Sequence, residues 1–174
     1  SVQVARHFGA RVTAVTSAGN AELVRRLGAD RVIDYRAEDF AARDETYDVI
    51  FDCVGNAPFE RVDRVLKPGG TLLQVIVDLK ALLGAKGHSR RSGKRVLPIA
   101  FTPGPADVEF AVRLYREGGL APVVDRTYPL DQIVEGHRYV DTGRKRGSVV
   151  LQVAGAMAGV SRTSGATHGA AARR

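Results

Sequence analysis

The sequence contains a single cysteine, no long apolar run and no recognisable leader. Cys53 alone excludes an internal disulfide and a zinc cluster made of thiolates. No stretch approaches the roughly 18 uncharged apolar residues of a membrane-spanning helix, which excludes the integral-membrane class. The chain begins at Ser1 without a basic-then-apolar segment, so we expect no secretory signal, a cytoplasmic location and a true start that lies further upstream.

Acidic residues are missing from two stretches, although the chain carries 26 basic and 19 acidic residues and a net charge of +7. Residues 80–95 hold six basic residues and residues 154–174 hold three. The other 17 basic residues are outnumbered by the acidic ones, so the excess charge is confined to a loop and a tail. The basic loop at residues 86–95 (KGHSRRSGKR) has no interleaved aromatics, so we expect a solvated loop and no nucleic-acid partner.

The length of 174 residues and the 44% of hydrophobic residues are typical of a globular protein with one domain of ordinary size. Apolar runs alternate with helical patterns along most of the chain. The patterns predict helices at residues 2–8, 20–27, 59–66 and 106–117, and strands at residues 11–16, 31–35, 47–52, 71–77 and 95–99. Apolar strands that alternate with helices indicate an α/β fold with a doubly wound parallel sheet.

The pattern changes after Gly118-Gly119. Val123-Val124, a turn at Pro129, a helix at residues 131–141 and a strand at residues 148–153 form a separate unit. Residues 154–174 are mostly Ala, Gly, Ser, Thr and Arg, which bury too little apolar area to fold, so we expect a disordered tail.

Four blocks of the sequence together resemble the medium-chain dehydrogenase/reductase superfamily, particularly its zinc-independent quinone oxidoreductase-like branch. They are residues 9–35 (GARVTAVTSAGNAELVRRLGADRVIDY), 47–55 (YDVIFDCVG), 66–73 (LKPGGTLL) and 123–151 (VVDRTYPLDQIVEGHRYVDTGRKRGSVVL). The resemblance implies that residues 1–118 are a partial Rossmann cofactor-binding domain. Residues 119–153 would then be the segment that returns to the catalytic domain.

The chain departs from this family at its beginning, because it starts inside the helix that follows the glycine-rich turn. The first strand and that turn, where the pyrophosphate binds, are therefore absent. Removing strand 1 from the order 3-2-1-4-5-6 leaves two half-sheets with no shared neighbour. We therefore expect a C-terminal fragment that lacks the catalytic domain and is inactive alone.

The segment Thr16-Ser17-Ala18-Gly19-Asn20 stands where NAD-specific members carry an acidic residue at the end of the second strand. No carboxylate there would repel a 2′-phosphate, and Ser17, Asn20 and Tyr35 can donate hydrogen bonds to it, so NADP(H) is favoured over NAD(H). The alternative is a plain turn in which Asn20 caps a helix.

Two further segments are expected to contact the cofactor. Val54 and Gly55 follow a strand, and the resemblance implies that Gly55 lets the ribose approach the backbone; a tight turn is the alternative. The resemblance also places Ala100, Phe101 and Thr102 along the nicotinamide, with an apolar strand end as the alternative.

Two other features have a simpler interpretation. Residues 144–147 (RKRG) either approach the nicotinamide half or form a solvated charge run. Cys53 has no neighbouring histidine or second cysteine, so we expect a small core residue.

The resemblance implies the cofactor-binding part of an NAD(P)H-dependent oxidoreductase, which transfers hydride between nicotinamide and a small carbonyl, quinone, enone or alcohol. It also implies a homodimer, for which the strand near Arg95 is a candidate by analogy. No zinc is expected, because His7, His88, His137 and His168 lack metal-ligand spacing.

Two alternatives stay open at this point. One is an S-adenosylmethionine-dependent methyltransferase, because YDVIFD followed by LKPGG also resembles that family, although residues 94–153 lack its closing antiparallel hairpin. The other is a non-catalytic interaction module, because the chain holds no complete active site.

Overall fold

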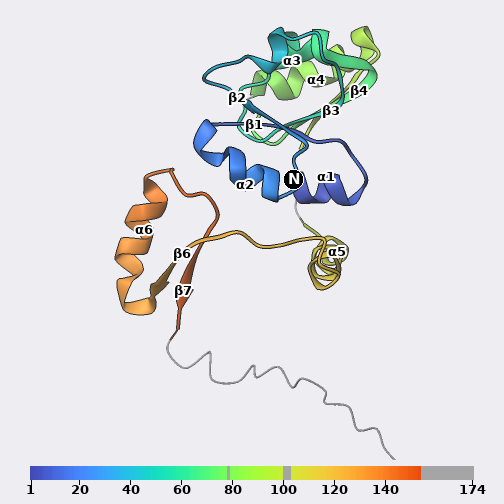
Figure 1. Ribbon diagram of the computed structural model, residues 1–174. Coiled ribbons are helices and arrows are strands. Elements are labelled where there is room, and N and C mark those ends of the chain that lie inside the picture. The colour runs from blue at the N-terminus through green and yellow to red at the C-terminus, as the bar shows by residue number, and fades with distance from the viewer. Residues whose placement is uncertain (78, 100–102, 154–174) are drawn as a thin grey trace, which may run out of the picture. The chain divides into compact units, whose positions relative to one another are not determined.

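The computed structural model describes residues 1–77, 79–99 and 103–153 (Figure 1). The chain divides into two compact units, Ser1–Ala121 and a second unit that begins at Pro122. The assignment of residues 1–118 and 119–153 to two functional domains stays a prediction, and the predicted disordered tail lies outside the described residues.

The first unit contains two parallel half-sheets. β1 (Thr13–Thr16) pairs with β2 (Arg31–Asp34), and β3 (Tyr47–Asp52), β4 (Leu66–Gln74) and β5 (Arg95–Pro98) pair in the order β3-β4-β5. Within the described ranges, no strand joins β1 to β3. This confirms the α/β fold and the two half-sheets expected when the central strand of a doubly wound sheet is absent.

Helices alternate with these strands, as the sequence patterns predict. The α-helices of the first unit are α1 (Val2–His7), α2 (Ala21–Arg26), α3 (Phe59–Val62), α4 (Leu79–Ser92) and α5 (Pro105–Arg116), and its short 3-10 helices are η1 (Ala18–Asn20), η2 (Phe40–Ala42) and η3 (Asp63–Val65). Gly28 ends α2 with φ 104°, and a Cβ there would lie 3.1 Å from Cγ of Arg6, so this position requires glycine.

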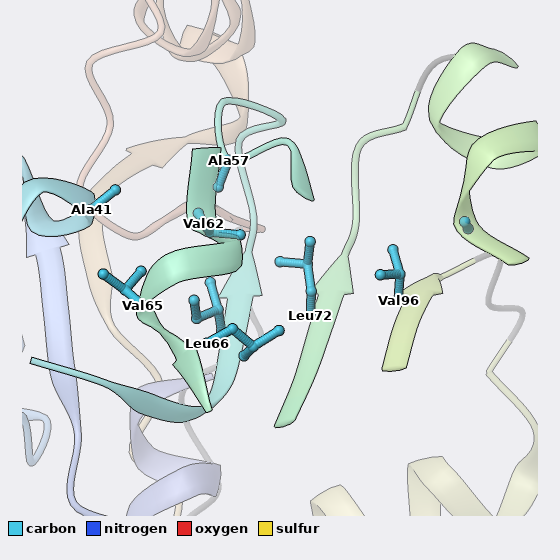
Figure 2. Packing of buried hydrophobic residues seen from close by; sticks show 9 residues of the cluster. Ala41, Ala57, Val62, Val65, Leu66, Leu72 and Val96 are labelled. Atoms are coloured by element: carbon cyan, nitrogen blue, oxygen red, sulfur yellow. The ribbon is translucent and has the colours of Figure 1, made fainter. Parts of the chain in front are cut away.

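The main hydrophobic core lies around the three-stranded half-sheet. It consists of Ala41, Ile50, Ala57, Val62, Val65, Leu66, Leu72, Ala85 and Val96. Figure 2 shows Val62, Val65 and Leu66 gathered beside Leu72. Full burial of one large apolar side chain stabilises the fold by about 1.5–3 kcal/mol. Burial of apolar side chains therefore stabilises the three-stranded half-sheet more than the two-stranded one.

The predicted helix at residues 59–66 is confirmed as far as Val65, but it is α-helical only to Val62 and its last residue, Leu66, belongs to a strand. α3 ends at Val62, η3 ends at Val65, and β4 begins at Leu66 and includes the Pro-Gly-Gly segment. Leu66 is in a strand because it pairs with Tyr47 of β3. The register of the two strands then shifts, and such an irregularity accommodates the proline in β4. A Cβ at Gly70 would lie 2.8 Å from the carbonyl oxygen of Lys67, so glycine is needed for this close approach.

The predicted basic loop at residues 86–95 is also wrong, because most of it is helical. α4 continues to Ser92 despite two glycines, each of which costs a helix about 1 kcal/mol. Packing offsets this cost, since Ala85 is buried in the core and Ser89 Oγ accepts a hydrogen bond from the Val96 N–H at 2.9 Å. Gly93, with φ 68°, then ends the helix.

The second unit is a strand-helix-strand motif. It consists of β6 (Val124–Pro129), the short η4 (Leu130–Gln132), α6 (Ile133–Asp141) and β7 (Ser148–Gln152). β6 and β7 pair in parallel, from Val124 opposite Ser148 to Pro129 opposite Gln152. In the part of the chain that the structure describes, no helix is both long and apolar enough to cross a membrane.

Candidate functional site

Parallel strands end at the same edge of a sheet, so the segments that follow them form a common surface. In open α/β sheets, ligands bind at this carboxyl edge. The segments after β1 and β2 make one part of the candidate site, and those after β3 and β4 make the other.

Ser17 and Tyr35 are the first residues after two paired strands. Thr16 pairs with Asp34 at the ends of β1 and β2, and the Tyr35 N–H donates to the carbonyl oxygen of Thr16 at 3.3 Å. The Tyr35 side chain is 57% exposed. The structure therefore places Ser17 and Tyr35 at the same end of neighbouring strands, with the tyrosine open to a ligand.

Asn20 stands at the N-terminal end of α2, but its side chain does not cap that helix. Its Nδ2 instead donates to Thr16 Oγ1, at the limiting distance of 3.5 Å. Asn20 is therefore the N-cap residue by position, as the alternative interpretation expected, but its side chain makes no capping hydrogen bond.

The basic residue nearest to Tyr35 along the chain is Arg36. Its Cζ lies 5.8 Å from the centroid of the Tyr35 ring, and its N–H donates to Asp34 Oδ1 at 3.0 Å. The Asp34 carboxylate is thus engaged with the turn after β2, and a guanidinium stands beside the exposed phenol. This end of the half-sheet combines the hydroxyls of Ser17 and Tyr35 with the guanidinium of Arg36 and the carboxylate of Asp34.

The turn after β3 is organised by Asp52, a residue that the sequence interpretation missed. Asp52 is 5% exposed. Its carboxylate accepts hydrogen bonds from the backbone N–H groups of Val54 (3.0 Å), Gly55 (2.8 Å) and Ala57 (2.9 Å). The signal was in the sequence, because an aspartate at a strand end with glycine three residues later is typical of a side-chain-stabilised turn.

Gly55 adopts a left-handed conformation in this turn, with φ 83°. A Cβ at this position would lie 3.1 Å from Ile76 Cγ2, in the segment that follows β4. The left-handed backbone and the contact with Ile76 therefore require glycine at this position even without a bound cofactor. Val54 beside it is 69% exposed at the carboxyl edge.

Cys53 in the same turn is exposed, so the expectation of a core residue is wrong. β3 directs the preceding residue, Asp52, into the interior, and successive side chains along a strand point to opposite sides.

The far end of the turn is held by Arg61, which the sequence interpretation also missed. Its Nη1 donates to the carbonyl oxygen of Asn56 at 2.6 Å, and its Nη2 donates to Asp39 Oδ1 at 2.7 Å. The Ala41 N–H, followed by the Arg61 guanidinium, holds the pKa of Asp39 below its ordinary value. The turn is therefore fixed at both ends by charged side chains.

The remaining predicted site residues cannot be placed beside these. Ala100, Phe101 and Thr102 lie outside the described residues. The basic segment at residues 144–146 is exposed on the loop between α6 and β7, in the second unit, where the Arg146 N–H donates to Asp125 Oδ2 at 2.8 Å.

A metal site in a protein needs several His, Cys, Asp or Glu side chains grouped together. Among the described residues, no three or more His, Cys, Asp or Glu side chains are grouped so that they could hold a metal ion. His88 contacts Glu60 and Phe59. Its Nε2 lies 3.3 Å from Glu60 Oε1, and its ring centroid lies 4.8 Å from that of Phe59.

The sequence profile of a family described as zinc-binding dehydrogenase matches residues 27–151. The 2-methylene-furan-3-one reductase of Solanum lycopersicum is 34% identical over 158 residues, which cover 86% of this chain and 36% of the reductase. The chloroplastic NADPH-dependent alkenal/one oxidoreductase of Arabidopsis thaliana is 33% identical, with the same two coverages. The solved quinone oxidoreductase of Coxiella burnetii superimposes with a TM-score of 0.72 at 25% identity, over 87% of this chain and 48% of that protein. The chain thus spans half or less of the length of these proteins.

Proposed function

Because the chain belongs to the zinc-binding dehydrogenase family, we propose that it is the cofactor-binding part of an NADPH-dependent oxidoreductase. The reaction proposed is hydride transfer between nicotinamide and the carbonyl, quinone or enone carbon of a small molecule. The observation that carries the proposal is the family match over residues 27–151, on a chain whose first unit contains parallel half-sheets. Two relatives, one named as a 2-methylene-furan-3-one reductase and one as an alkenal/one oxidoreductase, support the substrate class.

NADPH is proposed as the cofactor in preference to NADH. Ser17 and Tyr35 follow paired strand ends, and both carry hydroxyl donors suited to a 2′-phosphate. The segment at residues 16–20 contains no carboxylate to repel it, and the Arg36 guanidinium adds positive charge beside Tyr35. A relative named as NADPH-dependent supports the same choice.

The residues of this chain would bind and orient the cofactor, and none of them is proposed as a catalytic acid or base. Ser17 and Tyr35 would hold the adenosine phosphate, and Asn20 would support them through its contact with Thr16. Val54 and Gly55 would face the ribose next to the nicotinamide. When bound, the cofactor supplies the hydride. Correct placement of the two reacting carbon atoms is itself a large part of such catalysis.

The structure of the second unit argues against the methyltransferase alternative. That alternative requires a closing antiparallel hairpin, whereas β6 and β7 are parallel and joined through α6. The family match also extends through residue 151, which includes both strands.

Two expectations stay proposals. A homodimer would use β5, whose Leu97 is 45% exposed and whose pairing partner in the described sheet is β4. A cytoplasmic location rests on the sequence alone.

The proposal is tested by calorimetric titration with NADPH and with NADH at one ionic strength. The titration is made on residues 1–174 and on the longest reading frame that contains them. We expect NADPH to bind at least about tenfold more tightly than NADH, which corresponds to about 1.4 kcal/mol. Equal affinity or tighter NADH binding contradicts the cofactor choice, and no saturable binding by either protein contradicts the function.

A further inference from the structure

Asp52 uses both carboxylate oxygens on the backbone of the turn that follows it. Oδ1 accepts the N–H groups of Val54 and Gly55, and Oδ2 accepts that of Ala57. A carboxylate is suited to binding three N–H groups at once. When ionised, its two oxygens only accept hydrogen bonds and together offer about four lone-pair sites. Hydrogen bonds to a charged acceptor are also stronger than neutral ones.

The turn connects the interior of the unit to its open edge. Asp52 and Ala57 are 5% and 4% exposed, and Ala57 belongs to the main core. Cys53 and Val54, which lie between them, are exposed. The buried carboxylate therefore fixes the backbone of an exposed segment from the inside.

The turn is also placed against the next strand. The Val75 N–H donates to the carbonyl oxygen of Asp52 at 2.9 Å, and Ile76 lies against Gly55. Asp52 thus sets the position of the segments after β3 and β4 together, at the edge where ligands of parallel sheets bind.

We propose that Asp52 is a positioning residue of the cofactor site, whose buried carboxylate holds the turn from Cys53 to Ala57 in the form that the cofactor meets. The inference rests on the proposed function for the identity of the ligand. Asp52 itself faces the backbone N–H groups of its own turn, so it acts through Val54 and Gly55.

The test replaces the carboxylate by an amide of the same size. Asp52→Asn can keep the two bonds to Oδ1, but its second polar atom is an NH₂ group that meets the Ala57 N–H donor to donor. Asp48→Asn is the matched control, because Asp48 lies on the same strand, is exposed and pairs with Lys67 Nζ at 2.8 Å.

Two readouts are measured on the full chain of 174 residues and on the longest reading frame that contains it, with folding checked by circular dichroism. The first is amide hydrogen exchange at Val54, Gly55 and Ala57 without cofactor. We expect exchange slower than in an unstructured chain for the unsubstituted protein, and exchange about tenfold faster at Ala57 in Asp52→Asn. The second is the Kd for NADPH, expected to rise about tenfold in Asp52→Asn and to stay unchanged in Asp48→Asn.

The outcomes separate this inference from the proposed function. No saturable NADPH binding by the unsubstituted chain or by the longest reading frame counts against the function. Unchanged exchange in Asp52→Asn overturns the inference whether or not NADPH binds. Faster exchange with an unchanged Kd also overturns it, because the turn would then not belong to the site. If Asp52→Asn does not fold, the unsubstituted protein still decides, since unprotected amides at Val54 and Gly55 overturn the inference.

Discussion

The hydroxyl of Tyr139 donates a hydrogen bond to Oδ2 of Asp125 at 2.7 Å. The same oxygen accepts the N–H of Arg146 at 2.8 Å, and Cζ of Arg126 lies 3.8 Å from the centroid of the Tyr139 ring. One carboxylate thus connects β6, α6 and the loop before β7. This cluster holds together a unit whose strands are partly exposed.

Removing this hydroxyl is expected to destabilise the second unit. Tyr139→Phe keeps the ring beneath Arg126 but leaves Asp125 without one of its donors, so the thermal midpoint of the unit falls. Tyr115→Phe, at a 57% exposed position on α5, is the control and should leave the midpoint unchanged. Equal midpoints for Tyr139→Phe and the unsubstituted protein would show that the hydrogen bond adds nothing to stability.

Stability should also decrease in acid through Asp125. The Arg146 N–H, followed by the Tyr139 hydroxyl, holds the pKa of Asp125 below its ordinary value of 3.8. The folded state therefore binds the proton less readily than the unfolded state. The contribution to stability is complete above pH 3.8 and is lost as the pH falls through the lower pKa of the folded state.

The measurement is the free energy of unfolding between about pH 2.5 and pH 6, where an ordinary aspartate titrates. Asp125→Asn should flatten the acid limb of this curve relative to the unsubstituted protein. Asp39, Asp48 and Asp30 have pKa values shifted in the same direction and should keep part of the slope. A curve that Asp125→Asn leaves unaltered would contradict the assignment.

Much of the fold was predictable because local pattern and long-range pairing agree there. YDVIFD predicts β3 at its observed bounds, Tyr47–Asp52, and the absent first strand predicts two separate half-sheets. The prediction failed at Leu66, where pairing with Tyr47 in β3 overrides the helical pattern. It failed again in α4, where burial of Ala85 outweighs the glycines.

The site was predictable only in part, for a different physical reason. Ser17 and Tyr35 follow strand ends, and parallel pairing brings such positions together. The spacing of Asp52 and Gly55 indicates a side-chain-stabilised turn, but it does not show that both carboxylate oxygens accept hydrogen bonds from three N–H groups of that turn, because this depends on the backbone dihedral angles. The exposure of Cys53 was not predicted because the burial of Asp52, and hence the side on which the next residue lies, was not expected.

The core should be much more sensitive to truncation than the outer face of α4. Leu72 is 0% exposed, so Leu72→Ala should lower the free energy of unfolding by about 2–5 kcal/mol through lost burial and a cavity. Leu83 is 75% exposed, and Leu83→Ala should change it by less than about 0.5 kcal/mol. Urea unfolding of both variants checks this, and similar losses would mean that the face of α4 carrying Leu83 is buried in solution.

Cys53 offers a direct test of where the cofactor binds. It is the single cysteine of the chain and is exposed in the turn that Asp52 holds. A cofactor that covers this turn should slow the reaction of the thiol with a disulfide reagent, and NADPH at saturation is expected to slow it about tenfold, the change for a 90% shielded thiol at equilibrium. Adenosine 2′,5′-bisphosphate, which has no nicotinamide ribose, is the control and should leave the rate unchanged. Equal protection by both ligands would place the nicotinamide half of the cofactor elsewhere.

The final prediction concerns Ser17 and Tyr35, which follow the paired residues Thr16 and Asp34. A phenol and a hydroxyl at this edge can each donate one hydrogen bond to a 2′-phosphate, and a bond to a charged acceptor contributes about 1.5–3 kcal/mol. Tyr35→Phe and Ser17→Ala should therefore each raise the Kd for NADPH about tenfold and leave that for NADH nearly unchanged. Tyr35→Phe keeps the ring beside Arg36, so a loss specific to NADPH is assigned to the hydroxyl and not to the packing of the ring. An equal loss for both cofactors would mean that these residues support the fold, and no loss for either would mean that Tyr35 only covers the edge of the sheet.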